Sequence, residues 1–245
     1  MIVGFVGSGS MAAATARGWA GEFEQMLFSD GGSGRAQALT AELGGTAVSN
    51  AEIGARADLV VLAVKPAMLA AAAAELGAAK VVVSLLGATP LAAIAAAFPR
   101  SEVHRVMPNV AVEVGRGVLC ISGRPSPPVR EKLALLGHVV ELPDEDFDAA
   151  TAVMGCAPAY LALAVEAIAD AGAADGLDPD LARELVVETA AGTAELLRTH
   201  SPAAVREAVA SPGGSTEAGL EALEREGAGA AFEAAVRASL ERMRG

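Results

Sequence analysis

A glycine-rich turn near the start of the chain places the strongest constraint on its fold. Residues Gly7 to Ala12 read G-S-G-S-M-A, and they lie between the apolar run Ile2–Val6 and the helix-like stretch Ala12–Ala20. A strand, a G-x-G-x-x-G/A turn and a helix in this order are typical of dinucleotide binding. The first glycine permits the turn, the second lets the backbone approach a pyrophosphate, and the helix start offers free N–H groups. The residues expected at the cofactor are Gly7, Ser8, Gly9, Ser10 and Met11.

The first half of the chain alternates short apolar runs with alanine-rich helical stretches. The predicted strands are Ile2–Val6, Met26–Ser29, Leu59–Val64, Val81–Leu85, Val103–Met107 and Gly117–Ser122. Continuous apolar strands separated by helices predict a parallel sheet that is covered on both faces. Together with the glycine turn, this pattern predicts an α/β fold with an N-terminal Rossmann-type domain over residues 1–145.

After about Asp146 the strand-like runs end, and the remainder has the pattern of helices separated by glycines. The predicted helices are Phe147–Ala171, Pro179–Thr199, Pro202–Ala208, Thr216–Glu226 and Ala230–Met243. Aromatic residues make up only 3% of the chain, so its core must be built from Ala, Val and Leu. We therefore expect an all-helical domain over residues 146–245.

Charge and composition disfavour several classes of partner. The formal net charge is −12, whereas proteins that bind nucleic acids or anionic membranes normally carry a basic face. No uninterrupted apolar run reaches the ~18 residues that a membrane span needs, and the start MIVGFVGSG lacks the basic region of a signal peptide. Cys120 and Cys156 form no metal-spaced cluster. We expect a cytoplasmic protein without metal, membrane or nucleic-acid partners.

The type of dinucleotide stays open at this stage. Asp30 follows the second predicted strand, where an acidic group commonly binds the ribose 2′-OH of NAD. The neighbouring residues Ser29, Ser33 and Arg35 could instead hold the 2′-phosphate of NADP. Each of these side chains could also be an ordinary polar loop residue. The sequence therefore predicts NADPH or NADH as the cofactor, with Ser29 and Asp30 near its ribose.

Three further motifs lie at the ends of predicted strands or at a helix start. Ala63-Val64-Lys65-Pro66 closes one strand, and Arg105-Val106-Met107-Pro108-Asn109 closes another. In an open α/β sheet the carboxyl ends of strands face the ligand crevice. Ser211-Pro212-Gly213-Gly214-Ser215-Thr216 opens a helix in the second half, and a helix start with free N–H groups can receive a carboxylate.

These motifs, taken with the glycine turn, resemble the set that marks pyrroline-5-carboxylate reductases. The resemblance continues through Asp148 to Ala152 (D-A-A-T-A), Pro158 to Tyr160 (P-A-Y) and Glu188 to Leu197 (E-T-A-A-G-T-A-E-L-L). It covers nearly the whole chain in the family's order. It is therefore more specific than the glycine turn alone.

The resemblance implies a two-domain reductase whose helical domain interlocks with that of a partner subunit in a homodimer or a dimer-based higher oligomer. It implies hydride transfer from the nicotinamide to the C=N carbon of 1-pyrroline-5-carboxylate, which gives L-proline and places the chain in proline biosynthesis. By the same analogy, the further residues that line the cofactor are Asn50, Ala63, Val64, Lys65, Pro66, Met107, Pro108 and Asn109. The residues at the substrate are Gly213, Gly214, Ser215 and Thr216.

The chemistry of imine reduction agrees with this assignment. A cyclic imine needs hydride delivery, a held carboxylate and a proton for nitrogen, and the cofactor performs the difficult step. The Thr216 hydroxyl is the candidate catalytic group that bonds or protonates the imine nitrogen, directly or through water. The alternative for Thr216 is a simple helix N-cap.

The chain departs from the family pattern at Met154-Gly155-Cys156-Ala157, where the family has Ser-Gly-Ser-Gly. This change could make the substrate pocket tighter and less polar, or it could be drift in a packed helix start. The turn Leu86-Gly87-Ala88 also differs from the family's Ala-Ala-Gly. A reductase of a related cyclic imine therefore stays open, as does a dinucleotide sensor without catalysis. A β-hydroxyacid dehydrogenase is disfavoured because the helix from Pro158 to Gly172 has no lysine.

Overall fold

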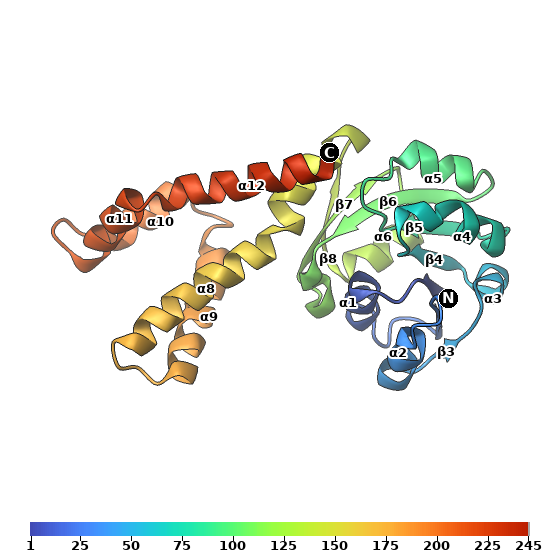
Figure 1. Cartoon of the computed structure of the whole chain (residues 1–245), viewed down its shortest axis with the longest axis horizontal. Helices are drawn as coiled ribbons and strands as arrows, with labels where there is room; N and C mark the ends of the chain where they lie inside the picture. Colours follow the sequence, from blue (N-terminus) through green and yellow to red (C-terminus); the bar gives the residue numbers. More distant parts are fainter. Residues whose placement is uncertain (245) are drawn as a thin grey trace. The chain divides into compact units, whose positions relative to one another are not determined.

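A computed structural model describes residues 1–244 of the chain, which Figure 1 shows coloured along the sequence. These residues form two compact units. The first contains Met1–Gly155 together with Arg242 to Arg244, and the second contains Cys156–Glu241. The sequence placed the division after residue 145, ten residues earlier than the division between the compact units.

Within the described residues of the first unit, eight strands form one sheet in the order β3-β2-β1-β4-β5-β6-β7-β8. The strands are β1 (Ile2–Val6), β2 (Gln25–Ser29), β3 (Thr46–Ala47), β4 (Leu59–Leu62), β5 (Val81–Ser84), β6 (Glu102–Pro108), β7 (Gly117–Ser122) and β8 (Gly137–Glu141). The first six strands along the chain are mutually parallel. The predicted Rossmann-type fold is thereby confirmed.

The far end of the sheet differs from the prediction of a purely parallel arrangement. Strand β7 pairs with β6 in the antiparallel sense, with Pro108 opposite Leu119, and β8 is parallel to β7. The connection between β6 and β7 holds only the short 3₁₀ helix η2 (Val110–Val114). A parallel crossover needs a dozen or more residues, so this short turn dictates antiparallel pairing. The sheet is therefore mixed.

Helices cover both faces of the sheet because successive strand residues point to opposite sides. Val3, Phe5, Leu59 and Val61 face the layer that contains α1, α2 and α6, whereas Val60 and Leu62 face α3, α4 and α5. The helices are α1 (Ser10–Gly18), α2 (Arg35–Leu43), α3 (Asn50–Arg56), α4 (Leu69–Leu76), α5 (Leu91–Ala97) and α6 (Pro127–Ala134). This three-layer arrangement fixes the carboxyl ends of the parallel strands at one edge.

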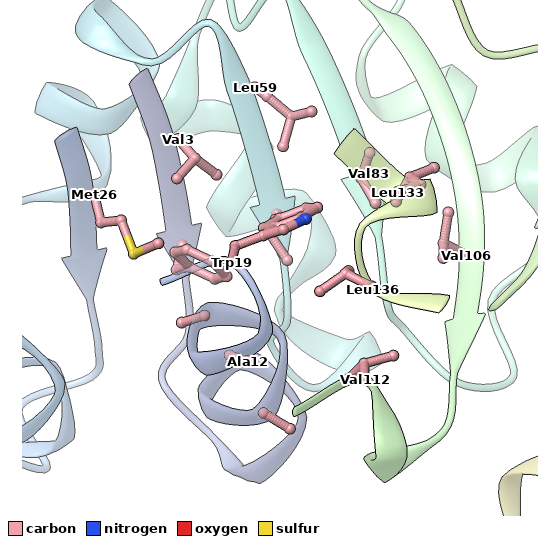
Figure 2. Packing of buried hydrophobic residues seen from close by; sticks show 14 of the residues in the cluster. Val3, Ala12, Trp19, Met26, Leu59, Val83, Val106, Val112, Leu133 and Leu136 are labelled. Atoms are coloured by element: carbon pink, nitrogen blue, oxygen red, sulfur yellow. The ribbon is translucent and has the colours of Figure 1, made fainter. Parts of the chain in front are cut away.

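Trp19 fills the centre of the first layer. Figure 2 shows its indole among Val3, Leu59, Val112 and Leu136, which come from two strands, η2 and the segment just after α6. The Trp19 side chain is fully buried, and its indole N–H donates to the Lys132 carbonyl at 2.7 Å. The one tryptophan thus supplies bulk that the alanine-rich helices lack, and its polar atom is satisfied.

The connector that ends the first unit contains η3 (Asp144–Asp146), α7 (Phe147–Ala150) and a π-helical turn at Thr151–Gly155. The sequence predicted one unbroken helix over Phe147–Ala171, which is wrong. The interruption lies where Pro158, in the first turn of α8, cannot donate to the carbonyl of Met154 four residues earlier. The Met154 carbonyl accepts from the Asn109 side chain instead, at 3.2 Å.

The second unit, described by itself, is entirely helical over Cys156–Glu241, as predicted. Its helices are α8 (Ala157–Ala174), α9 (Pro179–Leu196), α10 (Pro202–Val209), α11 (Ser215–Arg225) and α12 (Ala228–Arg244). In Figure 1, α8 and α9 form a helical hairpin, and α12 returns from α11 toward the start of α8. There the Tyr160 hydroxyl lies 2.5 Å from the Ser239 hydroxyl.

One helical stretch, Asp144–Ala174, is long and apolar enough by length and composition to cross a membrane, with a mean hydropathy of 1.7 over its 18-residue window. The sequence predicted no such stretch, because only uninterrupted apolar runs were considered, and this prediction is wrong. Acidic residues such as Glu166 interrupt the run while the average stays high. Only 11% of the window is buried within the chain. An apolar helix covered by another protein chain meets the same criterion.

Candidate active site

The glycine turn adopts the geometry that its sequence requires. Gly7 has a φ of +93°, which side chains disfavour, and its N–H donates to the Ser29 carbonyl at 3.1 Å. A Cβ atom on Gly7 would lie 2.5 Å from the Ala63 carbonyl oxygen, so the turns after β1 and β4 are in contact. A Cβ on Gly9 would meet nothing within 4 Å, so Gly9 faces open space. Gly7 is therefore needed for the turn itself, whereas Gly9 leaves space beside the turn.

Helix α1 begins directly after Gly9. Gly9 is its N-cap, and no side chain within the described part of the chain caps this helix end. The first N–H groups of a helix have no partner inside the helix, and they carry a partial positive charge. The start of α1 is therefore free to receive an anionic group, as the sequence predicts for a pyrophosphate.

The other predicted cofactor residues gather at the same edge of the sheet. Ser29 ends β2, and residues Ala63 to Pro66 follow β4. Met107 and Pro108 end β6, and Asn109 follows it. Strands β2, β1, β4, β5 and β6 are parallel neighbours, so their carboxyl ends lie together. The strand order reverses between β1 and β4, since β2 pairs with one side of β1 and β4 pairs with the other. Helices α1 and α4 accordingly lie on opposite faces of the sheet. This reversal marks the position at which open α/β sheets bind ligands.

A pocket of about 420 Å³ lies beside the glycine turn. Its lining includes Ser8, Gly9, Ser10, Arg17, Arg35 and Val110. Arg17 is engaged by Glu42 at 2.6 Å and by Glu113 at 3.4 Å. Arg35 is exposed at the start of α2, and its side chain makes no hydrogen bond or ion pair with residues 1–244. It is therefore available to an anionic ligand.

The Asp30 carboxylate is used by its own loop. It accepts hydrogen bonds from the Gly32 N–H at 2.8 Å, the Ser33 hydroxyl at 2.8 Å and the Ala36 N–H at 3.1 Å. The bond from the Ala36 N–H contributes most to lowering the pKa of Asp30 to about 2. This carboxylate therefore closes the β2–α2 loop and stabilises the first turn of α2.

Asn50 is connected to the end of β2 through Ser29. The Ser29 hydroxyl donates to Asn50 Oδ1 at 2.5 Å, and Asn50 Nδ2 donates to the Glu75 carboxylate at 2.6 Å. The buried Ser8 hydroxyl donates to the Ser29 carbonyl at 2.9 Å. These bonds join the glycine turn, β2 and the start of α3 in one polar network at the carboxyl edge of the sheet.

Asn109 is more deeply integrated in the protein than its motif indicates. It is 8% exposed, its Oδ1 accepts from the Val118 N–H at 3.1 Å, and its Nδ2 donates to the Met154 carbonyl at 3.2 Å. Its backbone N–H and carbonyl bond to Val118 and Val112. The sequence motif marked Asn109 as a site residue, but nothing in the sequence indicated that Met154 is its partner.

In the second unit, Gly214 is the N-cap of α11, and no side chain of the described residues caps this helix. Gly213 has a φ of +72°, and its N–H donates to the Glu217 carboxylate at 2.6 Å. The loop thus already binds a carboxylate of its own chain. Thr216 is exposed, and its hydroxyl makes no hydrogen bond within residues 1–244. The simple N-cap role considered for Thr216 belongs to Gly214 instead.

The two cysteines are free thiols in different surroundings. Burial raises the pKa of the Cys120 thiol, which lies on β7, and Cys156 lies at the start of α8. Among the residues that the structure describes, no group of three His, Cys, Asp or Glu side chains is placed to hold a metal ion. Each unit, taken by itself, offers donors to a ligand: the first has the uncapped start of α1 behind the glycine turn, and the second has the hydroxyl and N–H groups at the start of α11.

A doubly wound sheet with a G-x-G-x-x-A turn at its switch point, followed by a helical unit, defines a dinucleotide-dependent oxidoreductase. Two family models match the chain. Residues 2–87 match NADP oxidoreductase coenzyme F420-dependent, and residues 144–245 match pyrroline-5-carboxylate reductase dimerisation.

Curated relatives identify the family. The pyrroline-5-carboxylate reductase of Synechocystis is 38% identical over 79% of this chain and 76% of its own length. That of Thermus thermophilus is 36% identical over 85% and 82%. The chain belongs to the pyrroline-5-carboxylate reductase family, and the resemblance drawn from its motifs is confirmed.

Solved structures agree with this assignment. The Plasmodium falciparum pyrroline carboxylate reductase with NADP bound has a TM-score of 0.86 at 26% identity and covers 99% of this chain and 97% of its own. The 1-pyrroline-5-carboxylate reductase of Streptococcus pyogenes has the same TM-score at 28% identity, with 99% and 98% covered. The dimerisation model covers the apolar stretch Asp144–Ala174, which supports a dimer or a higher oligomer.

Proposed function

We propose that this chain reduces 1-pyrroline-5-carboxylate to L-proline with NADPH. The observation that carries the proposal is the uncapped start of α1 behind Gly9, at the switch point of a sheet whose relatives are pyrroline-5-carboxylate reductases. When bound, the reduced nicotinamide supplies the hydride that the imine carbon receives. The protein residues bind the dinucleotide, orient the substrate and supply a proton.

The residues of the first unit fit a dinucleotide. Gly9 leaves space for a pyrophosphate, and the free N–H groups of α1 offer donors to it. The other residues proposed to line the cofactor are Gly7, Ser8, Ser10, Met11, Ser29, Asp30, Asn50, Ala63, Val64, Lys65, Pro66, Met107, Pro108 and Asn109. Asp30, Asn50 and Asn109 contribute by shaping the loops, since their side chains are bonded within the protein.

NADPH is the preferred form of the cofactor in this proposal. Arg35 lines the pocket beside the glycine turn with a free guanidinium, and Arg side chains recognise phosphate through charge-assisted hydrogen bonds. The Asp30 carboxylate, which would otherwise select the ribose 2′-OH of NAD, already accepts three hydrogen bonds from its own loop. The 2′-phosphate would therefore meet Arg35.

The substrate carboxylate is assigned to the loop of Gly213, Gly214, Ser215 and Thr216. The N–H of Gly213 binds the Glu217 carboxylate, which supports the same chemistry for a ligand carboxylate. The Thr216 hydroxyl has no partner within residues 1–244, and we assign it the proton that the imine nitrogen takes as its carbon gains the hydride. The proton is replaced from solvent.

Assembly and location are part of the proposal. We propose a homodimer, because exposed apolar side chains of α8 and α9 lie within the dimerisation region. We propose the cytoplasm as its compartment, which suits a protein with two free thiols.

The test is NADPH oxidation by the purified protein with 1-pyrroline-5-carboxylate and with a panel of other cyclic imines. Turnover should be highest with 1-pyrroline-5-carboxylate. A higher kcat/KM for another imine would make that imine the substrate. The differences from the family pattern at Met154 and Cys156 are consistent with such an outcome. Binding of NADPH without turnover of any imine would contradict the proposed activity and favour the alternative, a dinucleotide sensor without catalysis.

The role of Thr216 is tested with matched variants. Thr216→Val keeps the shape of the side chain but loses the hydroxyl, and we expect its kcat to fall by about 100-fold or more, within the range of general acid catalysis. Thr216→Ser keeps the hydroxyl and should retain most activity. The affinity for NADPH should stay the same in both variants. A Thr216→Val enzyme with the kcat of the parent would refute the proton-donor assignment.

A further inference from the structure

We infer that Asn109 and Arg105 are positioning residues, which hold the cofactor-side turn at the end of β6 against the connector Asp144–Gly155. This inference rests on the proposed function, since it concerns the alignment of the bound nicotinamide. Arg105 lies in the middle of β6 and Asn109 directly after it, and both contact the connector within the first unit. Neither needs to touch the substrate for this role.

The Asn109 side chain forms hydrogen bonds to two different segments next to the turn. Its Oδ1 accepts from the Val118 N–H of β7, and its Nδ2 donates to the Met154 carbonyl of the π-helical turn. That carbonyl is free to accept because Pro158 has no N–H to donate to it. The proline and the asparagine therefore act together. Without Asn109 the Met154 carbonyl would lose this bond, and Met107 and Pro108 would lose their anchor.

Arg105 holds the start of the same connector. Its side chain is only 5% exposed, and its NH1 donates to the Asp144 carboxylate at 3.0 Å, while Asp148 lies 4.0 Å away. The guanidinium also lies 4.4 Å from the ring centroid of Phe147, which is fully buried. Asp144 in addition accepts from the Leu91 N–H at the start of α5 at 3.0 Å. The connector is thus bound to β6 and to α5.

Buried polar contacts of this kind specify geometry more than they add stability. A buried ion pair adds little stability compared with apolar packing, but the loss of one partner is costly. The arrangement in which both partners are in contact is therefore strongly preferred. Hydride transfer depends steeply on geometry, because a displacement of about 1 Å can lower the rate by ~10²-fold. Residues that fix the Met107–Asn109 turn are therefore expected to affect kcat more than the binding of NADPH.

The decisive variant is Asn109→Asp, which has the same shape. The carboxylate still accepts from Val118, but its second oxygen faces the Met154 carbonyl and repels it. We expect kcat to fall by roughly 10- to 100-fold, with the Kd for NADPH within about twofold of the parent because direct cofactor contacts are retained. Protonation of the new carboxyl restores an O–H donor toward Met154. The ratio of variant to parent kcat should therefore increase as the pH is lowered.

Two further variants complete the test. Asp144→Asn removes the charge that Arg105 binds and should also lower kcat, whereas Glu145→Gln removes an exposed neighbouring charge that has no ion pair among residues 1–244 and should behave as the parent. Hydrogen exchange followed by mass spectrometry gives a readout without turnover: amides of Thr151–Gly155 should exchange faster in Asn109→Asp.

The outcomes separate the two proposals. A parent enzyme that fails to reduce 1-pyrroline-5-carboxylate contradicts the proposed function, and the exchange measurement then still tests the contact with the connector. An active parent with an unchanged kcat in Asn109→Asp refutes the positioning role. A kcat ratio that does not vary with pH also refutes it, since a merely destabilised variant would not recover on protonation.

Discussion

At the scale of single residues, Asp30 shows how local bonding changes the meaning of a motif. An acidic residue at the end of the second strand commonly selects NAD. Here three donors of the same loop bind its carboxylate, so Asp30 stabilises the entry to α2. We propose that the charge that faces the cofactor at this position comes from Arg35 instead.

The stability provided by Asp30 should depend on pH. Asp30→Ala is expected to lower the free energy of unfolding by about 0.5–2 kcal/mol at pH 7, the range measured for capping side chains. The pKa of this carboxyl is about 2 in the folded protein, below its unfolded value of 3.8. The stabilisation is therefore present above pH 4 and is lost as the pH falls toward 2. Denaturant unfolding of parent and variant at pH 7 and at pH 2 to 4 measures this; an equal difference at every pH contradicts it.

Arg35 should determine the choice of cofactor. Arg35→Ala is expected to raise the KM for NADPH by about 10- to 100-fold, because a hydrogen bond to a charged group contributes ~1.5–3 kcal/mol. The KM for NADH should change little, since NADH lacks the 2′-phosphate. Steady-state kinetics with both cofactors measure this, with Arg100→Ala, an exposed site on the α5–β6 loop, as the control. Equal effects on both cofactors would show that Arg35 binds another group.

At the scale of elements, the two neighbouring glycines of the turn between β1 and α1 are expected to affect different properties. Gly7 should affect the stability of the fold, and Gly9 should affect the binding of NADPH. Gly7→Ala is expected to destabilise the protein by about 2 kcal/mol or more, because φ is positive and the new methyl would meet the Ala63 carbonyl at 2.5 Å. Gly9→Ala should lose no more than about 1 kcal/mol, since the methyl points into open space and only the N-cap preference for glycine is lost. It should nevertheless weaken NADPH binding.

Thermal unfolding and NADPH titration of the two variants check this pair. The expected result is a large decrease of Tm in Gly7→Ala, and in Gly9→Ala a loss of affinity for NADPH with a much smaller decrease of Tm. A Gly9→Ala variant that binds NADPH like the parent would show that the pyrophosphate does not approach Gly9.

Most elements of the first unit could be predicted because each carries its own signal. Strands β1 and β7 have the predicted bounds, since their apolar runs define them locally. The edge strands β3 and β8 were not predicted. β3 has only two residues, and β8 is exposed or half-buried along its length, so neither forms a buried apolar run.

The remaining differences depend on contacts between distant residues. The direction of β7 follows from the length of the turn before it, and the break before α8 follows from Pro158 together with Asn109. The site motifs indicated which residues lie at the carboxyl edge, but not which of their polar groups the protein itself uses. Asp30 and Asn109 both illustrate this limit, because their partners lie outside the motifs.

At the scale of the whole molecule, exposed apolar side chains on α8 are consistent with the dimerisation region. Leu161 and Ile168 are 64% and 60% exposed, and a separation of seven residues places them on one face of the helix. Glu166 and Asp170 lie between or beside them in sequence. A helix of this kind needs a covering surface, and a second copy of the chain supplies it in the proposed homodimer.

Ile168→Glu should disrupt the assembly. A charge placed in an apolar interface without a partner costs several kcal/mol, so the dimer Kd should rise by about 100-fold or more. Light scattering coupled to size exclusion, at micromolar concentration and below, measures the mass directly. Arg100→Glu, a charge change on the first unit, should leave the mass unchanged. An Ile168→Glu protein with the parent's mass at all concentrations would place the interface elsewhere.

The short antiparallel turn between β6 and β7 also has a consequence for the order in which the chain folds. Pro108 and Leu119 meet across one small loop, whereas each parallel pair must first close a loop that contains a helix. Closing the shorter loop costs less entropy, and local contacts form faster than distant ones. The β6–β7 hairpin is thus the part of the sheet best able to form early, and it contains Arg105 and Asn109. The support for the connector can therefore be in place before the connector docks.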